Sequence, residues 1–242
     1  MANENGDWIM HGVPASDPSC IHTADELIAY IENAGFLPLF QNEVPGFSVE
    51  ERTVPEYWWS GDPMKDPWEW RERIARSGKL AYGKFFRRKA GFISREWFPY
   101  FANDRRDGYD FDARWEDEKA SARARKIMLL FDDAAELYSA DVKKRAGYGG
   151  DGEKNFEGVI SGLQMQTYLV MRDFRQRLNK KGEAYGWPCA VYATPEHLWG
   201  AALVTSAYRE EPEASRERIL ARMRKRYPEA DEKQIRKLLL NT

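Results

Sequence analysis

The stretch from Leu163 to Thr194 constrains the fold most, because it predicts a β-hairpin in a chain that otherwise carries mainly helix signals. From Leu163 to Met171 the side chains alternate between two sets, and a repeat of two residues is typical of a strand. The segment LNKKGEAYG (178–186) predicts a polar turn, and WPCAVYAT (187–194) predicts the returning strand. The sequence therefore predicts a β-hairpin over residues 163–194 with a basic tip.

Helix signals surround this hairpin. Thr23 and Glu26 form a capping box, and Gly35 marks the end of the helix that follows. Asp66-Pro67 predicts a helix start, and Gly78 predicts its end. Further helices are predicted over 114–131, 212–226 and 230–240, with a strand over 79–86 and a loop over 103–112.

Helices followed by a two-stranded hairpin with a basic tip are typical of winged-helix proteins. We therefore predict an α+β, helix-rich fold with winged-helix-like character and a β-hairpin wing. The predicted segments are a loosely packed arm (1–22), a helix-rich module (23–112), a winged-helix-like module (113–200) and C-terminal helices (201–242).

Charge is distributed unevenly along the chain, although the net charge is only −2. Residues 1–70 carry 2 basic and 13 acidic side chains, whereas residues 71–106 carry 11 basic and 3 acidic ones. A fold that gathers the basic segments on one face would attract a polyanion. The alternative is that the acidic and basic segments neutralise each other across an internal interface.

The basic residues that we predict to contact nucleic acid lie in two regions. In residues 84–100 basic side chains are interleaved with aromatic ones, a composition that suits phosphate contact and base stacking, although the same aromatics could simply form core. The second region is the predicted hairpin tip. The candidate residues are Lys84, Arg87, Arg88, Lys89, Arg95, Arg105, Arg106, Arg175, Arg177, Lys180 and Lys181.

Other sequence features indicate neither a metal, a cofactor nor a membrane. Cys20 and Cys189 are far apart, so they predict no disulfide framework and no zinc ribbon. The segment GYGGDG (147–152) lacks the Gly-Lys-Ser/Thr of a phosphate-binding loop. No signal peptide and no apolar run of membrane-spanning length is recognisable, so we expect a cytoplasmic protein.

Several motifs resemble one family of bacterial proteins over most of residues 60–200. They are DPWEWR (66–71), AYGKFF (81–86), KAGFISREWFPYFAN (89–103), RRDGYDFDARWED (105–117), LQMQTYLVMRDF (163–174) and YGWPCAVYATPE (185–196). These motifs are similar to those of the AlkZ-related family. That family is distantly similar to the AlkZ and YcaQ type DNA glycosylases, which consist of winged-helix modules and excise alkylated bases. The resemblance implies DNA as a partner and DNA repair as a process.

Gln164-Met165-Gln166 matches the Gln-apolar-Gln motif of those glycosylases. The resemblance implies that Gln164 and Gln166 are catalytic. On a strand, residues at i and i+2 point to the same side, so the two amides would face one pocket. There they could position a water molecule and stabilise a cationic sugar.

Three functions are compatible with these observations. The first is a DNA-binding protein of AlkZ-like ancestry without chemistry of its own. The second is an enzyme, a monofunctional DNA glycosylase that uses Gln164 and Gln166. The third is a protein-interaction or structural role, in which Arg87, Arg88 and Arg95 pair with acidic residues of segment 1–70.

Overall fold

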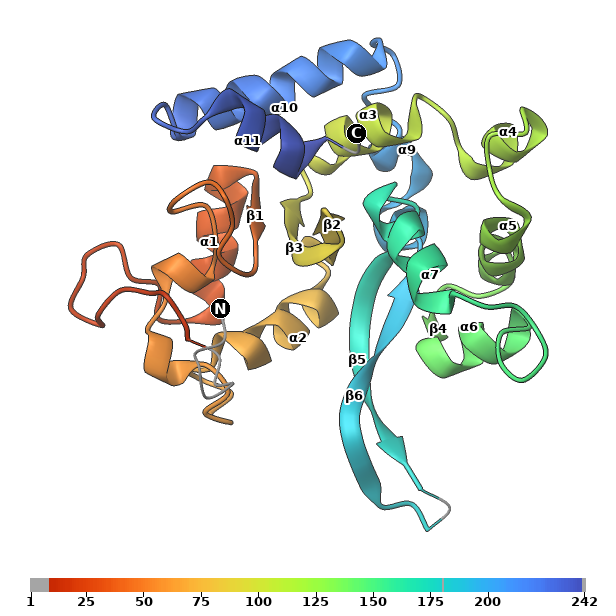
Figure 1. Ribbon diagram of the computed structural model, residues 1–242, viewed down its shortest axis with the longest axis horizontal. Helices are drawn as coiled ribbons and strands as arrows, with labels where there is room; N and C mark the ends of the chain where they lie inside the picture. The colour runs from red at the N-terminus through yellow and green to blue at the C-terminus, as the bar shows by residue number, and fades with distance from the viewer. Residues whose placement is uncertain (1–8, 180, 241–242) are drawn as a thin grey trace.

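The chain folds into short helices around one sheet (Figure 1), in a computed structural model that describes residues 9–179 and 181–240. The strands are β1 (Phe36–Pro38), β2 (Leu80–Phe86), β3 (Lys89–Ser94), β4 (Leu137–Tyr138), β5 (Val170–Leu178) and β6 (Ala184–Ala193). The α-helices are α1 (Ala24–Ala34), α2 (Pro67–Ser77), α3 (Phe98–Arg106), α4 (Phe111–Glu116), α5 (Ala122–Met128), α6 (Ser139–Arg145), α7 (Phe156–Met165), α8 (Pro195–Trp199), α9 (Ala201–Val204), α10 (Pro212–Arg226) and α11 (Glu232–Leu239). Short 3-10 turns are η1 (Glu50–Arg52), η2 (Pro55–Tyr57) and η3 (Leu129–Phe131).

One antiparallel sheet joins the N-terminal and C-terminal parts of the chain. Within the described residues its strand order is β1-β3-β2-β5-β6-β4. The bridge between the two halves is narrow, since β2 pairs with β5 only through Tyr82 and Met171. The predicted α+β class is confirmed.

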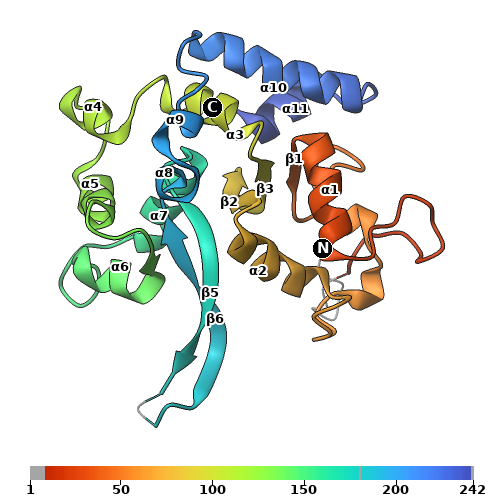
Figure 2. The ribbon, with the colours of Figure 1, turned by 180° about the vertical axis from the view of Figure 1, so that it is seen from behind.

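The helices lie in groups around this sheet. Figure 1 shows α1 and α2 beside β1–β3, α10 and α11 across the top, and α4–α7 on the opposite side. Seen from behind, α8 lies close to the end of β6 (Figure 2). The outer half of the β5–β6 hairpin projects away from the body in both views, and its residues are exposed.

The predicted caps of the first two helices are confirmed. The Glu26 backbone N–H donates to Thr23 Oγ1 at 3.1 Å, and α1 ends at Gly35 with φ of 99°. The Trp68 backbone N–H donates to Asp66 Oδ1 at 2.8 Å, and α2 ends at Gly78 in the left-handed conformation. These ends satisfy backbone groups that a helix leaves unpaired.

The predicted start of the hairpin at Leu163 is wrong, because α7 continues to Met165 and β5 begins at Val170. The helix ends in a Schellman motif, in which the Thr167 N–H donates to Gln164 O and the Tyr168 N–H donates to Leu163 O. Thr167 occupies the position that glycine usually takes, with φ of 64°. The sequence therefore lacked the glycine that signals a helix end.

The predicted helix over 114–131 is also wrong, since the helix is interrupted between α4 and α5. Glu118 adopts a positive φ of 56°, which ends the first helix. Ser121 then caps the second helix, with its Oγ accepting from the Ala124 N–H at 3.1 Å.

Arg105 and Arg106 do not lie in the predicted loop over 103–112, because α3 extends through them and ends at the left-handed Asp107. Both side chains are buried. Arg105 donates to the carbonyls of Met165 and Leu239, which are among the last residues of α7 and α11. Burial lowers its pKa to about 10, so it remains a cation at neutral pH. The cation complements the partial negative charge of the two helix ends.

Arg106 makes the most extensive set of buried polar contacts around α3. Its Nη1 donates to Glu196 Oε1 of α8 at 2.5 Å and to the Tyr208 hydroxyl at 3.4 Å. Its Nε and Nη2 donate to Thr167 Oγ1 and Thr167 O at 3.2 and 2.7 Å. The guanidinium also lies 4.5 Å from the centre of the Tyr168 ring. One side chain thus joins α3, the α7–β5 connection, α8 and the segment after α9.

The hydrophobic core runs through the whole described chain. One cluster of buried side chains extends from Ile21 to Leu239 and contains residues of all four predicted segments. The segment boundaries at 22, 112 and 200 stay predictions.

Replacing Arg106 by methionine is expected to lower the free energy of unfolding by about 3–5 kcal/mol, because Glu196 and the Thr167 carbonyl lose their buried partner. Urea denaturation followed by circular dichroism measures this change. Lys225→Met removes an exposed cation from α10 and is expected to alter stability by less than about 0.5 kcal/mol. Equal losses in the two variants would contradict the structural role of Arg106.

Candidate nucleic-acid interface

The turn between β2 and β3 presents two adjacent arginines in an unusual backbone conformation. Phe86 pairs with Lys89, so Arg87 and Arg88 form a two-residue turn. Their φ angles are 49° and 64°, as in a type I′ turn, which favours Asn-Gly at these positions. A left-handed conformation costs a residue with a side chain about 1–2 kcal/mol. The chain therefore places arginines where they weaken the fold.

The side chains of this turn face solvent. Arg87, Arg88 and Lys89 are exposed. Arg87 Nη1 lies 3.1 Å from Glu43 Oε1, and the two side chains are 44% and 35% exposed, so the pair is a surface pair of small energetic value. Lys84, nearer the core on β2, is half-buried.

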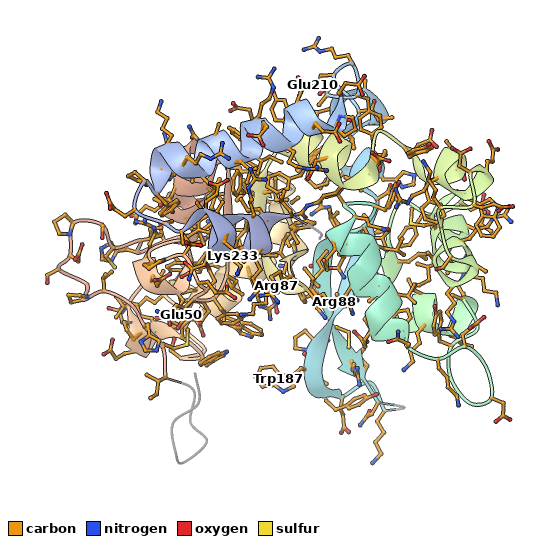
Figure 3. The ribbon with its side chains drawn as sticks, turned by 45° about the horizontal axis from the view of Figure 1, so that its top comes forward. Glu50, Arg87, Arg88, Trp187, Glu210 and Lys233 are labelled. Carbon is orange, nitrogen blue, oxygen red and sulfur yellow. The ribbon has the colours of Figure 1, made fainter. Side chains whose placement is uncertain are left out.

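The projecting β5–β6 hairpin carries the second basic group. Arg175 pairs with Glu136, and Arg177 donates from Nε to Cys189 Sγ at 2.8 Å. Both arginines and Lys181 are exposed, whereas Lys180 lies outside the described residues. Figure 3 places Arg87 and Arg88 on the same side of the molecule as Trp187 of this hairpin. We call the exposed basic residues of the turn and of the hairpin, together with Trp187, the basic face.

The remaining predicted contacts do not belong to the basic face. Arg95 lies with Lys79, Arg172 and Glu32 around a separate open depression. Arg105 and Arg106 lie inside the protein, where Arg105 donates to two carbonyls and Arg106 donates to Thr167 and Glu196. Sequence could not separate these two from Arg87 and Arg88, because both arginine pairs lie close to aromatic residues in the sequence. The same reasoning missed Trp187, whose indole is 75% exposed.

The ion pairs also bear on the idea that the basic segment packs against the acidic N-terminal third. In the described residues, Arg87–Glu43 is the one ion pair that joins Arg87, Arg88 or Arg95 to residues up to 70. It lies at the surface. If these three arginines neutralised the acidic segment, several ion pairs between them would be expected. The described structure contains one, and it is exposed.

Gln164 and Gln166 point in different directions, because they lie at the end of α7 and not on a strand. Residues at i and i+2 of a helix are about 200° apart. Gln164 is fully buried; its Oε1 accepts from the Lys84 N–H at 3.0 Å, and its Nε2 donates to Ile160 O at 3.2 Å. Gln166 lines a cavity of about 230 Å³ with Phe111 and Lys119.

Gln164 thereby supplies a hydrogen-bond acceptor at an irregular position of the sheet. The β2–β3 register is irregular between Gly83 and Phe86, and the Lys84 N–H falls in that gap. The amide oxygen of Gln164 satisfies this donor, which otherwise would be buried without a partner. The predicted single pocket for both amides is absent from the described structure, and the catalytic role of the pair stays a prediction.

A cavity of about 290 Å³ lies beside the Arg106–Glu196 pair, away from the basic face. Its floor is aromatic, with Phe111, Phe131 and Tyr168, and burial raises the pKa of the Tyr168 phenol, which stays protonated. Its lining combines carboxylates with the basic side chains of Arg106, Arg125 and His197. The lining carboxylates are Asp110, Asp112, Asp132 and Glu196.

Comparison with known proteins gives one match. A family model described as AlkZ related matches residues 21–240. No curated protein and no solved structure matches the chain. Among the residues that the structure describes, no helix combines the length and the apolar character needed to cross a bilayer.

Substituting Gln164 by alanine is expected to reduce the free energy of unfolding by about 1–3 kcal/mol, since the buried Lys84 N–H loses its acceptor. Gln166→Ala, at a half-buried helix end, is expected to change it by less than about 0.5 kcal/mol. Thermal and urea denaturation of the two variants measure the difference. Stability unaffected by Gln164→Ala would show that the Gln164–Lys84 bond is energetically unimportant.

Proposed function

The chain belongs to the AlkZ-related family, and from this premise we propose that it binds duplex DNA through phosphate groups, with the β5–β6 hairpin as a wing. The observation that carries the proposal is the turn of Arg87 and Arg88. Two arginines occupy backbone positions at which other residues would be more stable. Strain of this kind is found at functional sites as well as at helix ends, and residues 87 and 88 form a hairpin turn and no helix end.

The position of the basic face supports the same partner. Arg87 and Arg88 lie on the side from which Trp187 of the hairpin extends (Figure 3), and the hairpin adds Arg175, Arg177 and Lys181. Exposed arginines and lysines suit contact with phosphates.

Helix α7 precedes the wing, as the recognition helix does in a winged-helix protein. Its sequence, FEGVISGLQM, contains Glu157 and no lysine or arginine. Such a helix offers little to phosphates and few long donors to base edges. We therefore expect binding that depends on the DNA backbone and little on its sequence.

The double variant Arg87→Asn/Arg88→Gly tests the proposal. It is expected to raise the free energy of unfolding by about 1–2 kcal/mol, because Asn-Gly adopts the turn without strain. It is also expected to weaken binding of labelled duplex DNA. The slope of log affinity against log salt should fall by about 2, the value expected for two lost phosphate contacts.

Fluorescence anisotropy between about 50 and about 200 mM salt measures the affinities over a range in which phosphate contacts have a large effect. Lys143→Ala/Lys144→Ala removes the same charge from exposed positions of α6 and serves as the control. An equal effect of both double variants would show that the net charge of the protein, and not the position of Arg87 and Arg88, determines the affinity. Failure of the wild-type protein to bind at the lower salt concentration would reject DNA binding and favour an interaction role.

A further inference from the structure

A bulge in β6 sets Trp187 apart from the other tryptophans. Between the pairs Arg175↔Cys189 and Arg177↔Tyr185, β5 contributes one residue and β6 contributes three. The three are Gly186, Trp187 and Pro188. Extra residues of this kind bend a strand and redirect a side chain.

The side chain of Gln176 holds this bulge. Its Nε2 donates to Tyr185 O at 3.1 Å and to Gly186 O at 2.7 Å. Gly186 has φ of 64°, which glycine adopts at little cost, and Pro188 has no N–H that would need a partner. Local sequence and hydrogen bonding therefore agree in building the bulge.

The bulge leaves the indole of Trp187 outside the protein. It is 75% exposed, whereas Trp59, the next most exposed tryptophan among the described residues, is 42% exposed. Figure 3 shows the ring extending away from the hairpin ribbon. Tyr185, two residues away on the same strand, is 51% exposed, and neighbouring exposed aromatic side chains on a projecting element indicate a contact surface.

The charge around the ring favours nucleic acid as the partner. On the described part of the same hairpin, Arg175, Arg177 and Lys181 are exposed. Exposed basic groups beside an exposed aromatic ring match the requirements of a nucleic acid strand, because phosphates take the cations and base faces take the ring.

We propose that Trp187 stacks on a nucleobase, so that the hairpin prefers DNA that contains an unpaired base; this inference rests on the proposed DNA binding. In a matched duplex the base faces are covered by their neighbours, and a ring must separate them before it can stack. An unpaired base is already weakly stacked, so the same contact forms at lower cost.

The test uses the full chain and two labelled duplexes that differ by one extra unpaired 2-aminopurine. Wild-type protein is expected to bind the duplex with the unpaired base more tightly and to change the fluorescence of that base on stacking. Trp187→Ala is expected to lose about tenfold in affinity for that duplex, the size of one base–aromatic contact, and little for the matched duplex. Trp187→Phe should retain most of the preference.

Leu178→Ala is the matched control, because Leu178 is 62% exposed on the same hairpin. Its preference for the unpaired base should equal that of the wild type. An unchanged preference in Trp187→Ala, or equal losses on both duplexes, would overturn the stacking role and leave DNA binding standing. Absence of wild-type binding to either duplex would instead reject the proposed function itself.

Discussion

The buried guanidinium of Arg106 is the contact on which the C-terminal part of the fold depends. It neutralises Glu196 and donates to the Thr167 carbonyl. Thr167 itself has an unfavourable φ of 64°, and the contacts with Arg106 help to hold it in that conformation. Burying a cation is costly unless hydrogen bonds and an opposite charge compensate it. Arg106 is compensated by groups from three separate segments, at Thr167, Glu196 and Tyr208. Arg106 can therefore be buried only when these three segments are in place.

That arrangement determines where the hairpin leaves the body. Thr167 ends α7, and β5 begins three residues later at Val170. Arg106 contacts this connection, and beyond it the first residues of β5 are buried while the outer ones extend into solvent. The same helix end directs Gln164 toward the irregular part of β2, where it accepts the Lys84 N–H. The interior of the protein and the projection of the hairpin are therefore linked through one short connection.

At the surface, arginines lower the stability of the fold, in contrast to Arg106 in the interior. Arg87 and Arg88 occupy strained turn positions, and Trp187 sits on a bulge that keeps it unpacked. Neither feature improves folding, since Asn-Gly would suit the turn and a buried indole would add to the core. Local choices that oppose stability are expected at functional sites. Both features lie on the basic face, and they motivate the proposed binding of DNA and the proposed stacking on an unpaired base.

The sequence by itself determined the α+β class, the caps at Thr23 and Asp66, and the family, because these depend on local chemistry and on motifs that can be read in order. It also contained the helical spacing of Phe156, Ile160 and Leu163, which the period-two pattern from Leu163 onward obscured. Only the tertiary structure decided that Gln164 lies inside and apart from Gln166, that Arg105 and Arg106 are internal, and that Trp187 is exposed. These properties depend on partners up to 134 residues away, as in the bond from Arg105 to Leu239. A local pattern cannot distinguish an arginine that meets a distant carbonyl from one that meets solvent.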